Sequence, residues 1–273
     1  TPETSEAIKY VANTMLLTYI SFWNGVGARL GEKIDNIRIA DLRRGVTADD
    51  RISTWGSYVS NGAGGSCFGK DIQSLIYQLR RVDVNTKMLE SSYEVNEYQK
   101  VYLIDRAITE SDFSFSGKTI AVLGLAFKKQ TNDMRDSSSI KVIETLLGKG
   151  VKRIKAYDPL AITEARKEFS PSKNILFEKI EYFHNAQDAI EETDAVFISA
   201  DWEEFRGLSG TIENIVKPPY LVIDGRRMIP DFQELVNAGY SYIAVGSPAM
   251  LPEEKEAKTS KKSSSSEEKG VTA

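Results

Sequence analysis

The sequence contains very little of the two side chains that most often bind metals, and this scarcity limits its chemistry. Among 273 residues there is one cysteine, Cys67, and one histidine, His184. A single cysteine cannot form a disulfide within the chain, so we expect a reducing compartment, the cytoplasm. One cysteine and one histidine do not make a zinc ligand set, and we expect no metal site.

Long apolar runs and an excess of positive charge are absent as well. No run reaches the roughly 18 to 20 apolar residues that cross a bilayer, and no signal-peptide pattern is visible. The 39 acidic residues outnumber the 35 basic ones, whereas nucleic-acid binding needs a strongly basic surface. We therefore expect neither a membrane nor a nucleic acid as partner, while a local basic pocket for one phosphorylated ligand stays open.

The first part of the chain, residues 1–115, is predicted to be mostly helical. Apolar residues recur every three or four positions from residue 3 to about 32, which indicates a long helix. Its apolar stripe is broad, so we expect burial over much of its surface. Further helices are expected over about 36–45, from about residue 70 and over about 85–112, with a Gly/Ser/Asp/Asn-rich loop at 46–66.

From Gly117 onward, short apolar strands alternate with helical patterns. Strands are expected at 119–123, 151–157, 195–198, 220–223 and 240–245, with helices after Ser139, after His184 and near 230–238. This alternation predicts an α/β fold in which a Rossmann-like parallel-sheet domain, 116–250, follows the helical region. Residues 251–273 have no apolar periodicity and many Glu, Lys and Ser residues, and they predict a disordered tail.

Two glycine-containing segments bear on phosphate binding. Gly25-Val26-Gly27-Ala28-Arg29-Leu30-Gly31 has the wrong spacing for a dinucleotide fingerprint and no strand before it, so we interpret its glycines as helix glycines. Gly124-Leu125-Ala126-Phe127-Lys128-Lys129 follows a strand but lacks the later glycines of that fingerprint. It therefore indicates a nucleotide-binding topology without the dinucleotide signature.

Basic side chains follow the ends of two predicted strands. Lys128 follows the first strand, and Arg226 lies in Asp224-Gly225-Arg226-Arg227 after a later one. Because parallel strands end at one edge of a sheet, both can reach the same crevice and bind phosphate oxygens. The alternative is that they are ordinary solvated loop charges.

The single cysteine lies in Gly64-Gly65-Ser66-Cys67-Phe68-Gly69-Lys70-Asp71. Small neighbours admit a substrate and nearby charges tune a thiol, so Cys67 is a candidate nucleophile. The alternative is a small buried hydrophobe. In the first helix, Lys9 and Asn13 share one face, where they either stabilise an oxyanion or belong to a solvent-facing stripe.

Taken in chain order, these segments resemble the UDP-glucose/GDP-mannose dehydrogenase family. The segments that carry the resemblance are Glu6-Ala7-Ile8-Lys9-Tyr10-Val11-Ala12-Asn13, Asp50-Arg51-Ile52-Ser53, Gly62 to Asp71, Gly124 to Lys129, Asp133-Met134-Arg135-Asp136-Ser137, Tyr157-Asp158-Pro159, Trp202-Glu203-Glu204-Phe205 and Asp224-Gly225-Arg226-Arg227.

The resemblance implies an NAD-dependent four-electron oxidation of a sugar C6 alcohol to a carboxylate, with two NAD used per turnover. Cys67 would attack the intermediate aldehyde, and the thiohemiacetal would be oxidised to a thioester and hydrolysed. Lys9 would act on the C6 oxygen with Asn13 beside it, and Asp71 would handle water and protons. UDP-glucose, giving UDP-glucuronate, is the favoured substrate; a UDP-N-acetyl sugar, GDP-mannose, or a non-catalytic UDP-sugar-binding and dimerisation module are the alternatives.

The same resemblance implies a set of binding residues and a homodimer formed through the helical region. The substrate would contact Arg51 across the dimer interface and residues of the loop and strand ends, namely Tyr58, Ser60, Gly62, Gly64, Phe127, Lys128 and Arg226. Lys70 and Arg135 would lie near NAD. The family's amino-terminal NAD domain is missing from the sequence, so we expect the chain alone to be nearly inactive. Gly25, Gly27, Gly56 and Tyr58 depart from the family pattern.

Overall fold

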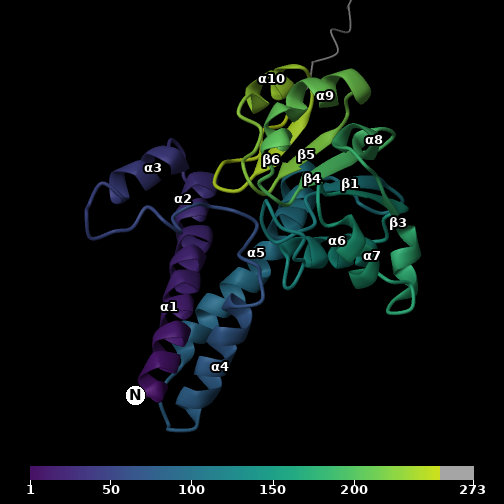
Figure 1. The fold of residues 1–273 in the computed structure, drawn as a ribbon. Coiled ribbons are helices and arrows are strands. Elements are labelled where there is room, and N and C mark those ends of the chain that lie inside the picture. Colours follow the sequence, from purple (N-terminus) through teal and green to yellow (C-terminus); the bar gives the residue numbers. More distant parts are fainter. Residues whose placement is uncertain (253–273) are drawn as a thin grey trace, which may run out of the picture.

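The computed structural model describes residues 1–252, which form a helical arm and a sheet domain (Figure 1). The arm contains α1 (Pro2–Phe22), a π-helical turn (Trp23–Gly27) and α2 (Ala28–Lys33), which together form the long helix predicted over 3–32. No strand precedes the glycines in this turn, as expected. A Cβ on Gly27 would lie 2.6 Å from the Trp23 ring, so the small residue allows that ring to pack on the helix.

The arm also contains α4 (Phe68–Arg80) and α5 (Lys87–Ser111), which both pack against α1. The short α3 (Ile39–Val46) lies apart from them (Figure 1). A small core of Leu17, Ile72, Ile76 and Leu89 joins the three helices. The expectation that α1 is buried over much of its surface is wrong for this chain. Its buried residues face α4 and α5, whereas Ile8, Met15 and Phe22 on other sides are 66%, 66% and 56% exposed.

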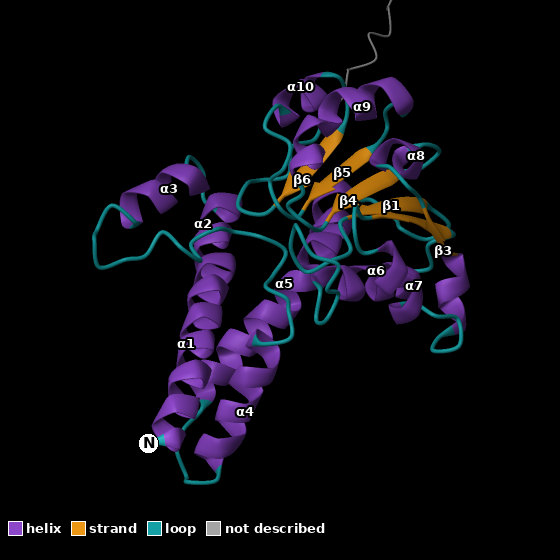
Figure 2. Cartoon of the chain, viewed as in Figure 1, coloured by secondary structure: helices purple, strands orange, loops and turns teal. Residues whose placement is uncertain are grey.

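Six parallel strands form the sheet, in the order β3-β2-β1-β4-β5-β6 (Figure 2). Five of them were predicted: β1 (Thr119–Leu123), β2 (Arg153–Tyr157), β4 (Ala195–Ile198), β5 (Leu221–Asp224) and β6 (Ser241–Ala244). The edge strand β3 (Ile180–Tyr182) was not expected from the sequence. The parallel α/β prediction is confirmed.

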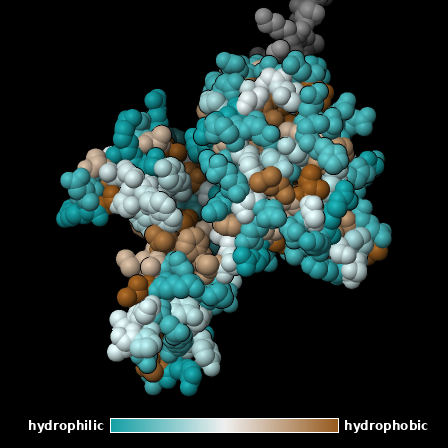
Figure 3. Space-filling view, viewed as in Figure 1, coloured by the Kyte–Doolittle hydropathy of each residue, from teal (hydrophilic) through white to brown (hydrophobic). Residues whose placement is uncertain are grey.

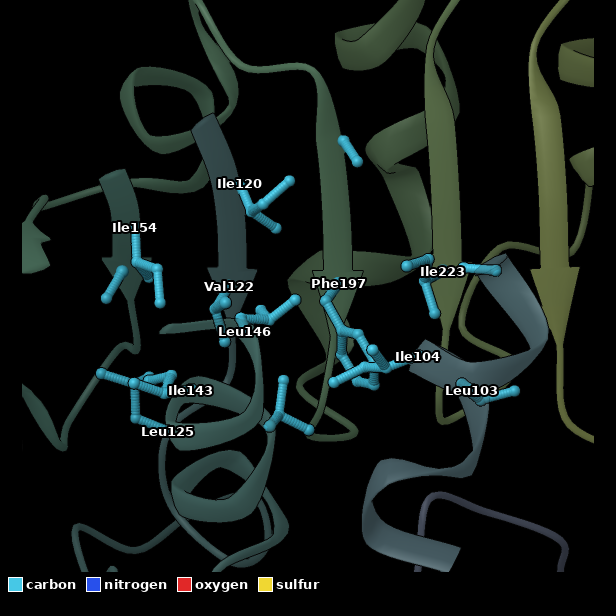
Figure 4. Close-up of a cluster of buried hydrophobic side chains, with 14 of the residues drawn as sticks. Leu103, Ile104, Ile120, Val122, Leu125, Ile143, Leu146, Ile154, Phe197 and Ile223 are labelled. Atoms are coloured by element: carbon cyan, nitrogen blue, oxygen red, sulfur yellow. The ribbon is translucent and has the colours of Figure 1, made fainter. Parts of the chain in front are cut away.

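Helices cover both faces of this sheet, and alternate residues of β1 point to opposite faces. Ile120 and Val122 pack with α5, α6 (Ser138–Gly148) and α7 (Ile162–Glu168), as Figure 4 shows for Leu103, Ile143 and Leu146. Ala121 and Leu123 pack with α8 (Ala186–Ile190), α9 (Leu208–Ile215) and α10 (Phe232–Asn237). Helix α5 therefore belongs to both the arm and the main core. Short 3-10 turns lie at Ile175–Lys179 and Glu203–Gly207.

Within residues 1–252, none of the helices combines the length and the apolar character that a membrane crossing requires. The tail predicted over 251–273 lies, except for its first two residues, outside the described part of the chain.

Candidate active site

The loop that leads to Cys67 crosses from the helical arm to the carboxyl ends of β4 and β5. The backbone amide of Asn61 donates to the carbonyl of Gly225 over 2.8 Å, and the Asn61 side chain donates to the Ser199 hydroxyl over 2.9 Å. A Cβ on Gly225 would lie 2.8 Å from the Asn61 side chain, so the glycine permits this close approach. The cysteine loop is therefore attached directly to the edge of the sheet where open α/β folds bind ligands.

Buried polar side chains of the helices hold the other side of this loop. Asn24 accepts from the Ser60 amide over 2.8 Å, and Gln99 donates to the Ser60 carbonyl over 2.6 Å. Asn96 bonds both the amide and the carbonyl of Ala63, over 2.8 and 3.0 Å. The sequence reasoning missed Asn24, Asn96 and Gln99. Nothing in the sequence distinguishes them from ordinary polar residues, which mostly face solvent.

The turn after β1 is organised by a buried carboxylate. Asp158 accepts hydrogen bonds from the amides of Leu125 and Ala126, over 2.7 and 3.1 Å, and from the Trp202 indole over 3.2 Å. Gly124 has a φ of +85°, and a Cβ there would lie 2.5 Å from that of Ala200. Glycine at position 124 thus permits both the tight turn after β1 and the close packing against Ala200.

Two of the predicted substrate residues extend from these strand ends. Phe127 packs under the cysteine loop, since a Cβ on Gly65, whose φ is +95°, would lie 3.0 Å from its ring. Arg226 is partly buried and donates through Nε to the Ser199 carbonyl over 2.8 Å. Burial lowers the pKa of Arg226, and the nearby Asp201 acts in the opposite direction. Lys128 is exposed, with its ammonium 5.2 Å from the centre of the Phe127 ring.

Cys67 is the N-cap residue of α4 and is exposed, so its interpretation as a buried hydrophobe is wrong. Its Sγ lies 4.0 Å from the Ser66 hydroxyl oxygen. The first turn of a helix has unpaired backbone N–H groups and a partial positive charge, which favours an anionic group there. An exposed thiol at this position is accessible to an electrophile.

Asp71 connects two of the other predicted catalytic residues, Asn13 and Lys9, with Lys70. Its carboxylate is fully buried and accepts from Asn13 and from Lys70, each over 2.6 Å, and Lys9 Nζ is 3.8 Å away. Burial acts to raise the pKa of Asp71, but these hydrogen bonds and the two lysine charges outweigh it, so the pKa lies below its ordinary value. The backbone amide of Asp71 donates to the Cys67 carbonyl over 2.8 Å. Asn13 and Lys9 therefore belong to a defined network next to the cysteine.

The two residues expected near NAD lie on either side of the cysteine segment: Lys70 is in the first turn of α4, and the carbonyl of Arg135 accepts from the Gly65 amide over 3.1 Å. The pKa of Lys70 lies above its ordinary value, chiefly because of its hydrogen bond to Asp71 and in smaller part because of Cys67. The pKa of Arg135 is also raised, first by its hydrogen bond to Asp133 and least by Cys67. Arg135 is exposed and forms an ion pair with Asp133 over 2.7 Å.

Within a single chain, the structure does not bring two of the predicted substrate residues to this site. The side chain of Arg51 is 88% exposed and pairs with Asp49, on a loop after α3 that stands away from the sheet (Figure 1). Tyr58 is exposed, with Arg43 above its ring at 4.1 Å. Residues 1–252 contain no cluster of three His, Cys, Asp or Glu side chains arranged for a metal ion.

Comparison with known proteins assigns both parts of the chain to domains of one family. Residues 3–98 match the central domain of the UDP-glucose/GDP-mannose dehydrogenase family, and residues 121–231 match the UDP binding domain of that family. UDP-glucose 6-dehydrogenase TuaD of Bacillus subtilis is 38% identical over 91% of the chain. UDP-glucose 6-dehydrogenase of Rickettsia prowazekii is 38% identical over 89%.

The same relatives are longer than this sequence. The chain spans 51% of the Bacillus subtilis relative and 54% of the Rickettsia prowazekii relative. Among solved structures, a UDP-glucose dehydrogenase from Pyrobaculum islandicum matches 90% of this chain and 52% of its own, with a TM-score of 0.77 and 27% identity. The chain therefore belongs to the UDP-glucose/GDP-mannose dehydrogenase family, whose central and UDP-binding domains it carries.

Proposed function

We propose that this chain is the portion of an NAD-dependent UDP-glucose 6-dehydrogenase that holds the nucleophile and the nucleotide-sugar site. The observation that carries the proposal is the network of Lys9, Asn13, Lys70 and Asp71 beside an exposed Cys67. The reaction is the four-electron oxidation of UDP-glucose to UDP-glucuronate, with NAD accepting a hydride in each of two oxidations. A thiol nucleophile has to stay reduced, which is consistent with a cytoplasmic location.

In this mechanism Cys67 acts on the C6 aldehyde produced by the first oxidation. Its thiolate forms a C–S bond to C6, and the carbonyl oxygen becomes an oxyanion that Lys9 and Asn13 stabilise. Loss of a hydride from C6 gives a thioester. Water then attacks C6, the C–S bond breaks, the Cys67 thiolate is restored, and the product leaves as a carboxylate. This hydrolysis releases both protons of the water: Asp71, an anion of lowered pKa that also orients Lys9 and Asn13, receives the first, and the second passes to solvent.

The nucleotide part of the substrate would lie at the strand ends. Arg226 and Lys128 would neutralise the diphosphate, while Phe127 and the loop of Tyr58, Ser60, Gly62 and Gly64 would contact the sugar and the base. The main NAD site would lie on the part of the relatives that this sequence does not span. Lys70 and Arg135 would stand at its edge, next to the thiol. A UDP-N-acetyl sugar or GDP-mannose would use the same kind of site.

A homodimer would cover the apolar side of α1. Ile8, Val11, Met15 and Phe22 are 44 to 66% exposed there. Part of this side borders an apolar cavity of about 450 Å³ that Leu75, Met88 and Leu89 also line. Brown apolar surface is visible among hydrophilic residues on the arm in Figure 3. In such a dimer, the exposed Arg51 of one protomer would reach the substrate of its partner.

The experiment that tests the function has two parts. Calorimetry with the 273-residue chain should show UDP-glucose binding but no NADH should form when NAD is added. A chimera that joins the amino-terminal half of the Bacillus subtilis relative to this chain should then form UDP-glucuronate. In that chimera, Cys67→Ala should lower the rate of UDP-glucuronate formation by roughly a hundredfold or more.

The outcomes separate the candidates. Formation of UDP-glucuronate at the unmodified rate by the Cys67→Ala chimera would show that the thiol is not the nucleophile. Binding of UDP-glucose without turnover by the chimera would instead favour a non-catalytic UDP-sugar-binding and dimerisation module. The chimera also identifies the sugar, because each nucleotide sugar can be offered in turn.

A further inference from the structure

Lys100 is a charged residue in the middle of α5 whose side chain is 0% exposed. Its ammonium is 2.6 Å from an oxygen of Asp136 and 2.7 Å from an oxygen of Glu97. A buried ammonium is unfavourable unless it is paired and hydrogen-bonded. Asp136 belongs to the sheet domain, whereas Glu97 and Lys100 belong to the helix. The Lys100–Asp136 pair therefore joins the two parts of the chain.

The two residues of this ion pair, Lys100 and Asp136, touch the chain on both sides of the cysteine. Before Cys67, a Cβ on Gly62 would lie 3.0 Å from Cγ of Lys100, and one on Gly64 would lie 2.5 Å from the Asp136 carbonyl oxygen. After Cys67, a Cβ on Gly69 would lie 3.1 Å from a carboxylate oxygen of Asp136. The glycines of the cysteine loop thus fit closely around the pair.

The backbone on either side of Asp136 also points to positioning. Asp136 has a φ of +54°, a left-handed conformation that is unfavourable for most residues. The carbonyl of Arg135, one residue earlier, accepts from the Gly65 amide over 3.1 Å. Ser137, one residue later, is the N-cap of α6. The Asp136 carboxylate is therefore held between the sheet domain and the cysteine loop.

We propose that the Lys100–Asp136 ion pair is a positioning device that holds the Cys67 loop against the turn carrying Arg135 and so fixes the position of the thiol relative to Lys70 and Arg135. This inference rests on the proposed function, in which Cys67 is the nucleophile. Lys100 touches neither the thiol nor a substrate in this scheme. It acts through Asp136 and the loop glycines.

The test measures how Cys67, the only cysteine in the chain, reacts with two reagents of similar size. Iodoacetate is an anion that nearby cations attract, whereas iodoacetamide is neutral. The ratio of the two alkylation rates therefore reports how close the positive charges lie to the thiol. A general loss of stability changes both rates together and is removed by the ratio. Alkylation needs neither NAD nor UDP-glucose.

Lys100→Met and Asp136→Asn should each lower the iodoacetate-to-iodoacetamide ratio at least twofold at low ionic strength. Lys100→Arg, which keeps the positive charge, should leave the ratio at the wild-type value. Lys118→Met is the matched control, because Lys118 pairs with Asp194 over 3.0 Å at the opposite end of the sheet, and it should leave the ratio unchanged. Circular dichroism verifies the fold of each variant.

The proposal would be overturned if folded Lys100→Met had an unchanged ratio, or if Lys100→Arg had a ratio as low as that of Lys100→Met. If Lys100→Met does not fold, Asp136→Asn decides by the same criterion. Calorimetry with UDP on the same variants separates this inference from the proposed function. Failure of the unmodified chain to bind UDP would count against the nucleotide site, and the alkylation ratio would still decide the positioning role.

Discussion

Gly64→Ala should destabilise the protein, because the added methyl group meets backbone atoms that have little freedom to move. The new Cβ would lie 2.5 Å from the Asp136 carbonyl oxygen and 3.2 Å from Cβ of Phe127. Asp136 is held by Lys100 and is followed by the cap of α6, so the cysteine loop itself has to shift. That shift would break the bond from the Gly65 amide to the Arg135 carbonyl.

The expected magnitude combines two contributions. Overpacking a closely packed site costs about 1 to 3 kcal/mol, and the loss of one backbone hydrogen bond costs about 1 kcal/mol more. Gly64→Ala should therefore reduce the free energy of unfolding by about 2 to 4 kcal/mol. Because the loop moves away from Arg135, the iodoacetate-to-iodoacetamide ratio at Cys67 should fall as well.

Gly210→Ala provides the matched control. Gly210 is exposed within α9, and an added Cβ would have no heavy atom within 4 Å. Since alanine is favoured over glycine in a helix by up to about 1 kcal/mol, this variant should be as stable as the unmodified chain or more so. Urea denaturation followed by circular dichroism measures both. A Gly64→Ala variant within about 0.5 kcal/mol of the unmodified chain, well below the overpacking cost, would refute the reasoning.

Three further predictions follow from the site and the arm. Folding lowers the pKa of Asp71 below its ordinary value of 3.8. The ionised carboxylate therefore stabilises the fold at pH values above 3.8, and this contribution is lost as the pH falls through the folded-state pKa. Asp71→Asn should thus lower the free energy of unfolding by about 1 kcal/mol at pH 7, a modest amount because the paired lysines are exposed, and by less near pH 3. Urea denaturation measures both values, and an equal loss of stability at the two pH values would contradict this. Arg226→Met should weaken UDP binding about 10- to 100-fold by calorimetry, the range expected for a hydrogen bond from a charged group, and unchanged affinity would remove Arg226 from the site. Met15→Asp should convert a dimer to a monomer in analytical ultracentrifugation, and an unaltered dimer would show that this side of α1 is not the interface.

The strands and long helices could be predicted because their signal is local. An apolar run such as 119–123 or a periodic pattern such as that of α1 is visible within one window of sequence. Two of the elements that were missed, β3 and α7, have weak local signals. Edge strand β3 has three residues, and α7 buries Ala165 alone, so neither shows a repeating apolar pattern. Burial of α1 was overpredicted because α4 and α5 cover only part of its apolar surface.

The candidate site was predictable only in part, for a different physical reason. The order of motifs made Cys67 and Asp71 candidates, but the side chains that hold the loop come from distant positions. Asn96, Gln99 and Lys100 bond partners that are 33 to 39 residues away in the sequence. From sequence alone a run of polar residues in a helix is typical of a solvent-facing stripe. Here the stripe is buried because the loop folds over it.

The glycines around Cys67 explain why this buried stripe is needed. Glycine allows the loop to approach Lys100 and Asp136 closely, but it also gives the free loop many conformations. A nucleophile on such a loop has no fixed direction unless neighbouring groups restrict the backbone. The side-chain amides of Asn96 and Gln99 on α5 and the Lys100–Asp136 pair restrict the loop from the helical side. The Arg135 carbonyl restricts it from the sheet domain. Substitutions on α5 should therefore change the reactivity of Cys67 without any contact between α5 and the substrate.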